Sequence, residues 1–349
     1  MAYTAIDDPE AYFQTVLYTG DGAANNAITL PGDTDMQPDF VWIKNRDATD
    51  SHCLFDSVRT ATEVLHADTT ATETTDADTL TSFDSDGFAL GADVKVNTDT
   101  EAYVAWNWKA NGAGSSNTDG SITSTVSANT TAGFSIVSYT GTSANATVGH
   151  GLGSTADVLM VKSRDGAHNW QILHKGLATN SGTKNLELNS TVAVLTDSST
   201  WNDTAPTSSV FTVGATNPTN QSGQNLIAYC FAEKTGYSKF GSYEGNSNAD
   251  GPFIYTGFRP AFVMGKSSAI EDWYLFDTTR DDRNVMFRLL YPNANYAEYT
   301  GATRMDFLSN GFKQYNTDNK FNASGSTYIY MAFAEAPFVN SNGVPCNAR

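Results

Sequence analysis

The residues best placed to do chemistry are a lysine, an aspartate and an arginine that occur twice at similar spacing. They are Lys44, Asp56 and Arg59, and then Lys266, Asp277 and Arg280. In each set the lysine ends one apolar run and the aspartate ends the next, so the two would approach each other near the ends of an antiparallel hairpin. This arrangement predicts a structural salt bridge, and the alternative interpretation is a polar ligand pocket.

The middle of the chain has different residues at the corresponding position. His174 and Lys175 stand where the other two sets have the aspartate and the nearby arginine. This departure argues against three equivalent active sites. If a ligand surface exists, we expect it where the copies differ, which makes His174 a candidate binding residue.

Three further candidates lie in polar segments whose composition predicts loops. Trp201 is surrounded by hydroxyl and amide residues, as a tryptophan that stacks on a sugar or docks a partner would be, and ordinary loop anchoring is the favoured alternative. Asp281 and Asp282 lie in a short acidic segment that suits a loop first and a cation or sugar contact second. The other candidate loop, DSDG at residues 84–87, resembles half of a calcium loop but fits a β-turn better.

The sequence has none of the common catalytic or cofactor motifs. There is no GxSxG elbow, P-loop, HExxH or GxGxxG motif after a strand, and the five histidines do not cluster at ligand spacing. The cysteines, Cys53, Cys230 and Cys346, are too few and too widely spaced for a disulfide framework or a zinc site. We therefore expect no enzyme activity, no cofactor and no metal.

The charge balance limits the partners. Thirty-eight acidic residues against 20 basic ones give a formal net charge of -18, which repels phosphate backbones and anionic membranes. No apolar run is long enough to cross a bilayer, and no secretory signal precedes the first acidic residues. These observations predict cytoplasmic synthesis, with no nucleic-acid partner and no membrane insertion.

The elements that would position these residues recur three times along the chain. A short strand ending in Tyr-X-Gly occurs at residues 16–20 and 137–141, and its third copy is at either 241–245 or 253–257. A strand ending in lysine then follows at residues 38–44, 156–162 and 260–266, and a closing aromatic strand at 103–108, 225–232 and 328–334. A whole pattern repeated in this order predicts an internal triplication.

The composition of each copy is typical of β-structure. The strands are short, rich in aromatic and β-branched residues, and bounded by Gly, Pro, Asn and Asp. We predict an all-β fold of three tandem related β-sandwich (jelly-roll-like) modules, with a propeller as the alternative. The predicted boundaries are 1–110 for module 1, 111–132 for a linker, 133–236 for module 2 and 237–349 for module 3.

Three segments resemble an uncharacterised repeat-domain family of marine tailed-phage structural and tail-fibre proteins. They are MAYTAIDDP with FQTVLYTG near the start, PDFVWIKNR at residues 38–46, and AFAEAPF at 332–338. The family has no established catalytic motif, so the resemblance implies a virion context and assigns no role to any residue.

The resemblance leads to an expected function. We expect a phage virion structural protein, a tail-fibre or receptor-binding component that engages the host surface. A capsid decoration or head-fibre protein is one alternative, and a carbohydrate-binding or depolymerase module is the other. The expected partners are other virion proteins and a host cell-surface glycan. By analogy with phage fibres the chain would form a homotrimer, or its three copies would supply a pseudo-threefold arrangement themselves.

Overall fold

The computed structural model describes residues 3–177, 181–301 and 304–346, and in this part of the chain the fold is all-β, as predicted. The helical segments described are single turns. The first of them, η1 (Pro9–Ala11), has Pro9 at its first position and Asp8 as its N-cap, whose side chain accepts a hydrogen bond from the Glu10 amide. No helix among the described residues has the length and apolar character needed to cross a membrane.

Three large antiparallel sheets form the frame. The first has the order β1 (Phe13–Thr19), β9 (Ala102–Trp108), β3 (Phe40–Asn45), β4 (Cys53–Asp56), β5 (Thr60–His66), β6 (Thr74–Thr75). The second has the order β10 (Ser115–Asn117), β11 (Ser124–Asn129), β12 (Phe134–Thr140), β19 (Asn225–Phe231), β14 (Val158–Ser163), β15 (Gln171–His174), β16 (Lys184–Glu187), β17 (Leu195–Thr196). The third has the order β20 (Ser238–Glu244), β26 (Thr327–Pro337), β22 (Phe258–Ser267), β23 (Trp273–Asp277).

A small sheet and a short helix accompany each large sheet. The small sheets are β2 (Asn26–Thr29), β8 (Gly87–Leu90) and β7 (Leu80–Asp84); β13 (Ala146–Gly149) and β18 (Val210–Val213); and β21 (Phe253–Tyr255), β25 (Gly311–Gln314) and β24 (Met305–Leu308). The helices are α1 (Val94–Asn97), α2 (Asn217–Asn220) and α3 (Asn319–Asn322), and η2 (Lys175–Leu177) and η3 (Ser181–Thr183) follow β15. We call each large sheet with its small sheet and helix a unit, numbered 1 to 3.

The same strand order recurs in the three units, and the pairing register defines equivalent positions. The orders β1-β9-β3-β4, β12-β19-β14-β15 and β20-β26-β22-β23 match one another. Within them three core aromatics occupy equivalent positions. Trp108 pairs with the first residues of β1 and β3, and Phe231 pairs with the first residues of β12 and β14. Phe333 likewise pairs with Ser238, the first residue of β20, and with Phe262 of β22. The third Tyr-X-Gly strand is therefore β20, with Tyr243, and not the segment that contains Tyr255.

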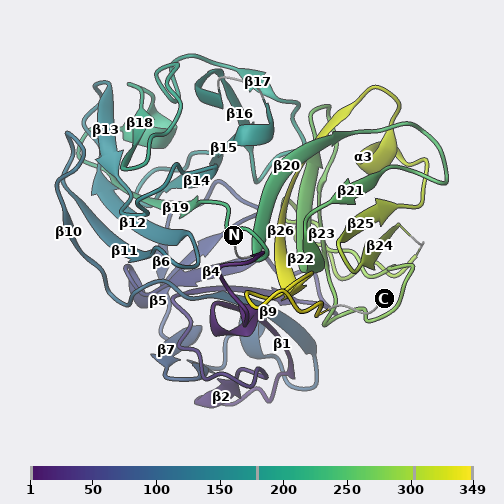
Figure 1. Cartoon of the computed structure of the whole chain (residues 1–349). Coiled ribbons are helices and arrows are strands. Elements are labelled where there is room, and N and C mark those ends of the chain that lie inside the picture. The colour runs from purple at the N-terminus through teal and green to yellow at the C-terminus, as the bar shows by residue number, and fades with distance from the viewer. Residues whose placement is uncertain (1–2, 178–180, 302–303, 347–349) are drawn as a thin grey trace.

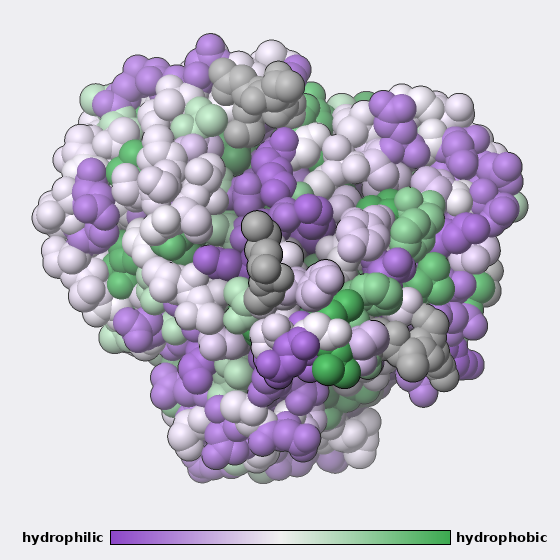
Figure 2. Space-filling view, in the orientation of Figure 1, coloured by the Kyte–Doolittle hydropathy of each residue, from purple (hydrophilic) through white to green (hydrophobic). Residues whose placement is uncertain are grey.

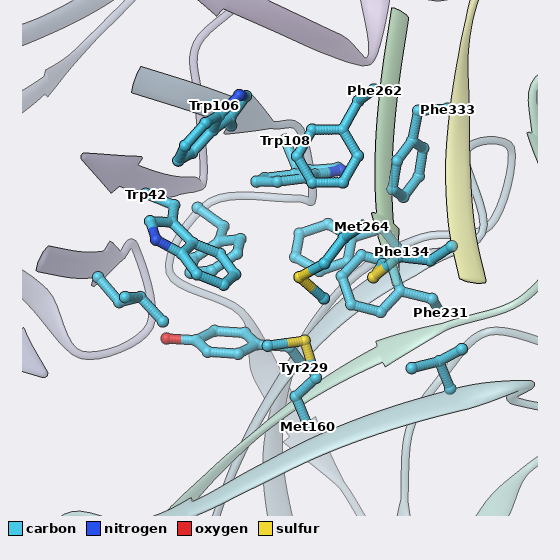
Figure 3. Packing of buried hydrophobic residues seen from close by; sticks show 14 of the residues in the cluster. Trp42, Trp106, Trp108, Phe134, Met160, Tyr229, Phe231, Phe262, Met264 and Phe333 are labelled. Atoms are coloured by element: carbon cyan, nitrogen blue, oxygen red, sulfur yellow. The ribbon is translucent and has the colours of Figure 1, made fainter. Parts of the chain in front are cut away.

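The three units surround a common core, and Figure 1 shows them as three lobes about a centre, with the N-terminus near it. One hydrophobic cluster contains residues from all three large sheets, among them Trp42, Trp106 and Trp108 of unit 1, Phe134, Met160, Tyr229 and Phe231 of unit 2, and Phe262, Met264 and Phe333 of unit 3 (Figure 3). Trp170 and Trp273 are buried here too, as expected of tryptophans that lie within strands.

Each unit also has an outer core between its large and small sheets. Separate clusters join Ile43 to Phe88 in unit 1, Leu159 to Phe211 in unit 2, and Val263 to Phe312 in unit 3. Both faces of each large sheet are thus covered. This explains why strands such as β3 are buried along their whole length and read as continuous apolar runs rather than alternating ones.

The predicted linker 111–132 is not a separate flexible joint. Strand β10 pairs with β11, and β11 pairs with β12 along six residues, so the segment extends the large sheet of unit 2. Serine and threonine suit an added strand at a sheet edge as well as they suit a loop, and composition alone does not separate the two.

Candidate functional site

The aspartate and arginine of the repeated set form a buried ion pair in both units where they occur. Arg59 Nε lies 2.5 Å from Asp56 Oδ2, and Arg280 Nε lies 2.5 Å from Asp277 Oδ2. All four side chains are fully buried. In each pair the other carboxylate oxygen accepts a hydrogen bond from the arginine's own amide, which fixes the turn after the strand.

The lysine of the set lies elsewhere, so the predicted approach of lysine to aspartate is wrong. The register pairs Asp56 with Phe40 and Asp277 with Phe262, which places each aspartate at the opposite end of the hairpin from its lysine. Lys44 Nζ instead donates to the carbonyls of Asn45 and Ala48, and Lys266 makes the same contacts with the carbonyls that follow it.

Lys162 is the equivalent lysine of unit 2, and its Nζ also donates to backbone carbonyl oxygens, one of them that of Thr70 in unit 1. Burial lowers the pKa of all three lysines to about 8. Their repeated role is to hold the loop that follows the strand. In the described part of the chain these contacts make them structural groups of the frame.

Each Asp–Arg pair receives a side chain from the neighbouring unit. Tyr229 of unit 2 donates its hydroxyl to Asp56 Oδ2 at 2.8 Å, and Trp106 of unit 1 donates its indole N–H to Asp277 Oδ2 at 3.0 Å. Tyr229 and Trp106 are equivalent residues, because each lies two positions before the core aromatic of its strand. The pairs therefore join units rather than open to solvent.

A glutamate completes each of these two seams. Glu298 binds Arg280 of its own unit and Arg46 of unit 1, at 3.0 and 2.8 Å. Burial would raise the pKa of Glu298, but the two arginines lower it to about 2. Glu73 likewise forms ion pairs with Arg59 of its own unit and with Arg164 of unit 2.

The seam between units 2 and 3 is built from neutral groups at these positions. His174 stands at the aspartate position, and its Nε2 lies 3.0 Å from the carbonyl oxygen of Tyr330. Because His174 Nδ1 accepts a hydrogen bond from Gly176, the ring is neutral and Nε2 carries the proton. Burial lowers the pKa of His174 to about 4. Met331 stands where the other seams have Trp106 and Tyr229.

A second set of cross-seam hydrogen bonds follows the same cyclic order. Trp170 Nε1 donates to the carbonyl of His66 in unit 1, and Trp273 Nε1 donates to that of Glu187 in unit 2, both at 2.9 Å. His52 is their equivalent in unit 1, four residues before Asp56, and its Nε2 lies 3.1 Å from the carbonyl of Tyr291 in unit 3. The buried polar groups of the repeated frame thus hold the three units together.

The remaining candidates do not form one site. Trp201 is fully buried in the outer core of unit 2, so the expected exposed stacking surface is wrong. Asp281 is also buried, and its carboxylate accepts hydrogen bonds from the amides of Phe287 and Arg288, which order a loop. Asp282 is exposed. Segment 84–87 forms the turn of the β7–β8 hairpin. Among the described residues, no three His, Cys, Asp or Glu side chains gather to hold a metal ion.

Exposed aromatic residues appear instead on strand β21 of unit 3. Phe253 is 46% exposed and Tyr255 is 61% exposed, while Ile254 between them is buried. The pairing of Ile254 with Phe312 matches that of Ile28 with Phe88 and that of Val148 with Phe211. Units 1 and 2 accordingly have small or polar residues at the two exposed positions, namely Ala27 and Thr29, and Thr147 and Gly149. The frame does not need aromatics here.

Tyr255 lines a surface hollow of about 400 Å³, which is also lined by residues of the segment 233–239 between units 2 and 3, by Tyr3, and by residues 338–339 after β26. Tyr3, which is 65% exposed, and Phe338 supply further apolar surface, while Glu233 and Lys239 supply charge. We call this the Tyr255 hollow. Figure 2 shows hydrophilic residues where the left and right lobes meet and hydrophobic residues below them on the same face.

The charges beside the Tyr255 hollow are fixed in position. Lys175 and Lys239 bind the two carboxylate oxygens of Glu233 at 2.5 and 2.6 Å. Burial opposes ionisation of Glu233, but these hydrogen bonds lower its pKa. A hollow of this size with aromatic walls and a few oriented polar groups suits a small polar ligand with an apolar face.

The comparison with known families covers nearly the whole chain. Residues 8–337 match a family described as a domain of unknown function, DUF7483. The chain belongs to this family. A comparison with curated proteins gives no match. The matched range of DUF7483 runs from η1 to the end of β26, so the family is defined over all three units together and not over one of them.

Sequence reasoning missed the Tyr255 hollow for a specific reason. Residues 253–257 look like a possible third Tyr-X-Gly strand, and an aromatic residue in a strand is usually buried. The two aromatics stand out only after the third copy is aligned on Tyr243. Phe253 and Tyr255 then fall at positions where the other units have small or polar residues.

Proposed function

We propose that this DUF7483 chain is a non-enzymatic binding component of a phage virion that engages a host-surface glycan through the Tyr255 hollow. The observation that carries the proposal is the pair of exposed aromatics, Phe253 and Tyr255, at positions where the repeated frame has no use for them. Tyrosine faces stack on the C–H faces of sugar rings while their hydroxyls stay hydrated, so exposed tyrosines favour a sugar ligand.

The architecture supports a binding role. We propose that the three units are related β-sandwich modules, at 1–110, 133–236 and 237–349, with 111–132 added to the second. The buried Asp–Arg pairs, lysines and His174 all bind neighbouring groups of the frame, which leaves a rigid body that presents variable surface residues. A rigid scaffold lowers the entropy cost of holding a ligand.

The virion context rests on the resemblance of the opening, 38–46 and 332–338 segments to phage structural proteins. The proposed partners are other virion proteins and a host-surface glycan, and the alternative position is a capsid decoration or head fibre. Immunogold labelling of purified virions tests this: label on the tail supports a fibre or receptor-binding role, label on the head supports decoration, and no label on either contradicts the virion proposal.

Glycan binding is tested on an array of bacterial surface polysaccharides. We expect Tyr255→Ala to weaken binding about fivefold, the effect of losing one aromatic contact worth roughly 1 kcal/mol. Tyr296→Ala is the matched control, because Tyr296 is 57% exposed but lies outside the hollow. Equal affinity of both variants would contradict the assignment of the site, and release of oligosaccharides by the wild type would favour the depolymerase alternative.

A further inference from the structure

The three units differ in what covers the first strand of the repeated frame, which is β1, β12 or β20. In unit 2, strand β11 pairs with β12 over six residues. In unit 3, the short helix η2 packs against β20, and the Glu233 carboxylate accepts a hydrogen bond from the Phe240 amide at 3.4 Å. In the described part of the chain β1 pairs only with β9, so its other edge has no strand beside it. We call this the β1 edge.

The β1 edge presents backbone groups that β9 does not use. The Gly20 amide donates to the carbonyl of Glu101 on the β9 side. Because hydrogen bonds alternate in direction along an antiparallel strand, the N–H and C=O groups of Thr15, Leu17 and Thr19 point the other way. A row of such groups at the edge of a sheet is a template for a further strand.

The seam between units 1 and 2 shows how such a strand fits. There Ser57, which follows the aspartate of the buried pair, donates its hydroxyl to the carbonyl of Gly112. The amide of Asn111 in turn donates to Ser127 of β11. In unit 3 the residue after the aspartate is Thr278, and it lines a hollow of about 170 Å³ beside β1. This hollow between units 1 and 3 thus corresponds to the place that β11 holds between units 1 and 2.

An exposed apolar side chain marks the β1 edge. Leu17 is 37% exposed, and the pairing register makes it equivalent to Ser138 of β12 and Ser242 of β20. Two units of the same frame therefore have a small polar residue where unit 1 has leucine. Since the frame does not need an apolar residue at this position, the Leu17 side chain is available to a partner.

Strand β11 also indicates the chemistry of a segment that fits. Its sequence, STVSAN, is uncharged and made of small residues. An acidic segment would be repelled, because Glu10 and Glu335 line the hollow and the whole chain has a formal net charge of -18. In unit 2, Thr125 of β11 pairs with Ser138. A segment on the β1 edge would have an apolar residue there, because Leu17 replaces the serine.

We propose that the β1 edge binds an extended, uncharged, Ser/Thr-rich segment of another protein, which pairs with residues 15–19 as β11 pairs with β12. Main-chain hydrogen bonds supply the affinity, and an apolar side chain against Leu17 supplies the selectivity. This docking site lies apart from the Tyr255 hollow, and it does not depend on glycan binding.

The test uses a peptide of residues 122–131 that carries Thr125→Val and a fluorescent label, with binding to the full chain followed by fluorescence anisotropy. We expect Leu17→Pro to weaken binding about tenfold, because proline removes an outward N–H and leaves the hydrogen bonds to β9 in place. Leu17→Ser keeps this N–H and should weaken binding less. Ser242→Pro, the equivalent change on β20, is the matched control and should bind the peptide as the wild type does.

Two results would overturn the proposal directly. One is failure of the peptide to bind the wild type. The other is equal affinity of the wild type and Leu17→Pro, since the peptide would then bind elsewhere, for example in place of β11. A peptide that also carries Ser127→Pro should not bind, because it lacks a donor of the new strand pair.

Two further measurements keep the test decisive. If Leu17→Pro does not fold, hydrogen exchange of the wild type replaces it: slower exchange of amides 15–19 with the peptide supports the site, and unchanged exchange there overturns it. Sedimentation of the wild type alone tests a second copy as the occupant. A dimer that Leu17→Pro or Leu17→Ser dissociates would assign the β1 edge to self-association and overturn the proposal of a separate partner.

Discussion

At the scale of single residues, the frame uses charged groups to join units. Tyr229 and Trp106 each reach from one central strand into the Asp–Arg pair of the next unit. The fully buried pair would be costly by itself, because two ions lose their hydration, and the added donors and Glu73 or Glu298 satisfy the remaining oxygen and nitrogen atoms. The polar residues that most resemble an active site are therefore structural.

Replacing Tyr229 tests this role. Tyr229→Phe removes the hydrogen bond that the hydroxyl donates to Asp56 and the one that it accepts from Arg59, at 2.8 and 3.2 Å, and leaves the ring in the core. We therefore expect the free energy of unfolding to fall by about 2 kcal/mol or more. Urea denaturation followed by tryptophan fluorescence measures it. Tyr296→Phe, which changes an exposed tyrosine, serves as the control, and an equal effect of both changes would show that the seam bond contributes nothing.

His174 makes the stability of the chain depend on pH. Its pKa is about 4 in the folded protein, against 6.5 when unfolded, because burial disfavours the charged ring and Lys175 repels it, while the hydrogen bond to the Tyr330 carbonyl opposes the shift. The unfolded state therefore binds more protons between pH 6.5 and 4, and folding loses up to about 3 kcal/mol as the pH falls through this window. The contribution is fully present above pH 6.5.

His52, His66 and His150 have lowered pKa values as well, so the pH dependence of the wild type includes their shares. His174→Gln removes the share of His174 from this pH dependence, since the glutamine amide does not gain a proton in this range. We expect the difference in unfolding free energy between pH 7 and pH 5 to be smaller in this variant than in the wild type. Identical pH profiles would refute the assignment.

At the scale of elements, each unit repeats a latch between its first strand and its short helix. The hydroxyls of Tyr18, Tyr139 and Tyr243 donate to carbonyls in α1, α2 and α3. The last residue of each helix is a buried asparagine, whose amide bonds two backbone carbonyls in every copy, at Asn97, Asn220 and Asn322. These residues explain why Tyr-X-Gly recurs.

The glycine of this motif is required by close approach of the backbone. A Cβ atom on Gly20 would lie 2.1 Å from the carbonyl oxygen of Thr98, and the equivalent glycines Gly141 and Gly245 have the same conflict at 2.2 Å. We expect Gly20→Ala to destabilise the fold by about 3 kcal/mol, at the upper end for an overpacked site. Thr19→Ala, one residue earlier and exposed, should change the melting temperature little.

The strands could be predicted from the sequence because short apolar runs between turn residues are a local pattern. The burial of Trp201 could not be predicted in this way. Its polar sequence neighbours indicate a loop, and they carry no information on the outer core into which the side chain packs. The same holds for Lys44, which lies apart from Asp56 because of the hairpin register. The Tyr255 hollow could not be predicted either, because its walls come from segments far apart in the sequence, namely Tyr3, residues 233–239, β21 and residues 338–339.

At the scale of the whole molecule, the arrangement is cyclic. Unit 2 donates to unit 1 through Tyr229, unit 1 to unit 3 through Trp106, and unit 3 offers the Tyr330 carbonyl to His174 of unit 2. A tyrosine or tryptophan faces an Asp–Arg pair at two seams, and Met331 accompanies a histidine at the third. The seams are therefore distinct, and this distinction favours one order of the three units over others.

The central core also determines how the chain unfolds. The inner face of each large sheet packs against the other two units, because the large aromatics of all three meet in one cluster. Removing one unit would expose apolar surface of the other two, and each Å² of it costs about 25 cal/mol. The three units, although each has an outer core, should not be stable independently of one another.

We therefore expect a single cooperative transition when the full chain is heated, with a calorimetric enthalpy equal to the van't Hoff enthalpy. The fragment 1–110 should fail to fold as a monomer, because Trp42, Trp106 and Trp108 would lose their partners from units 2 and 3. Differential scanning calorimetry of the chain and circular dichroism of the fragment measure both outcomes. Three separate transitions, or a fragment with a cooperative melt, would show that the outer cores suffice and that the units are independent modules joined in a row.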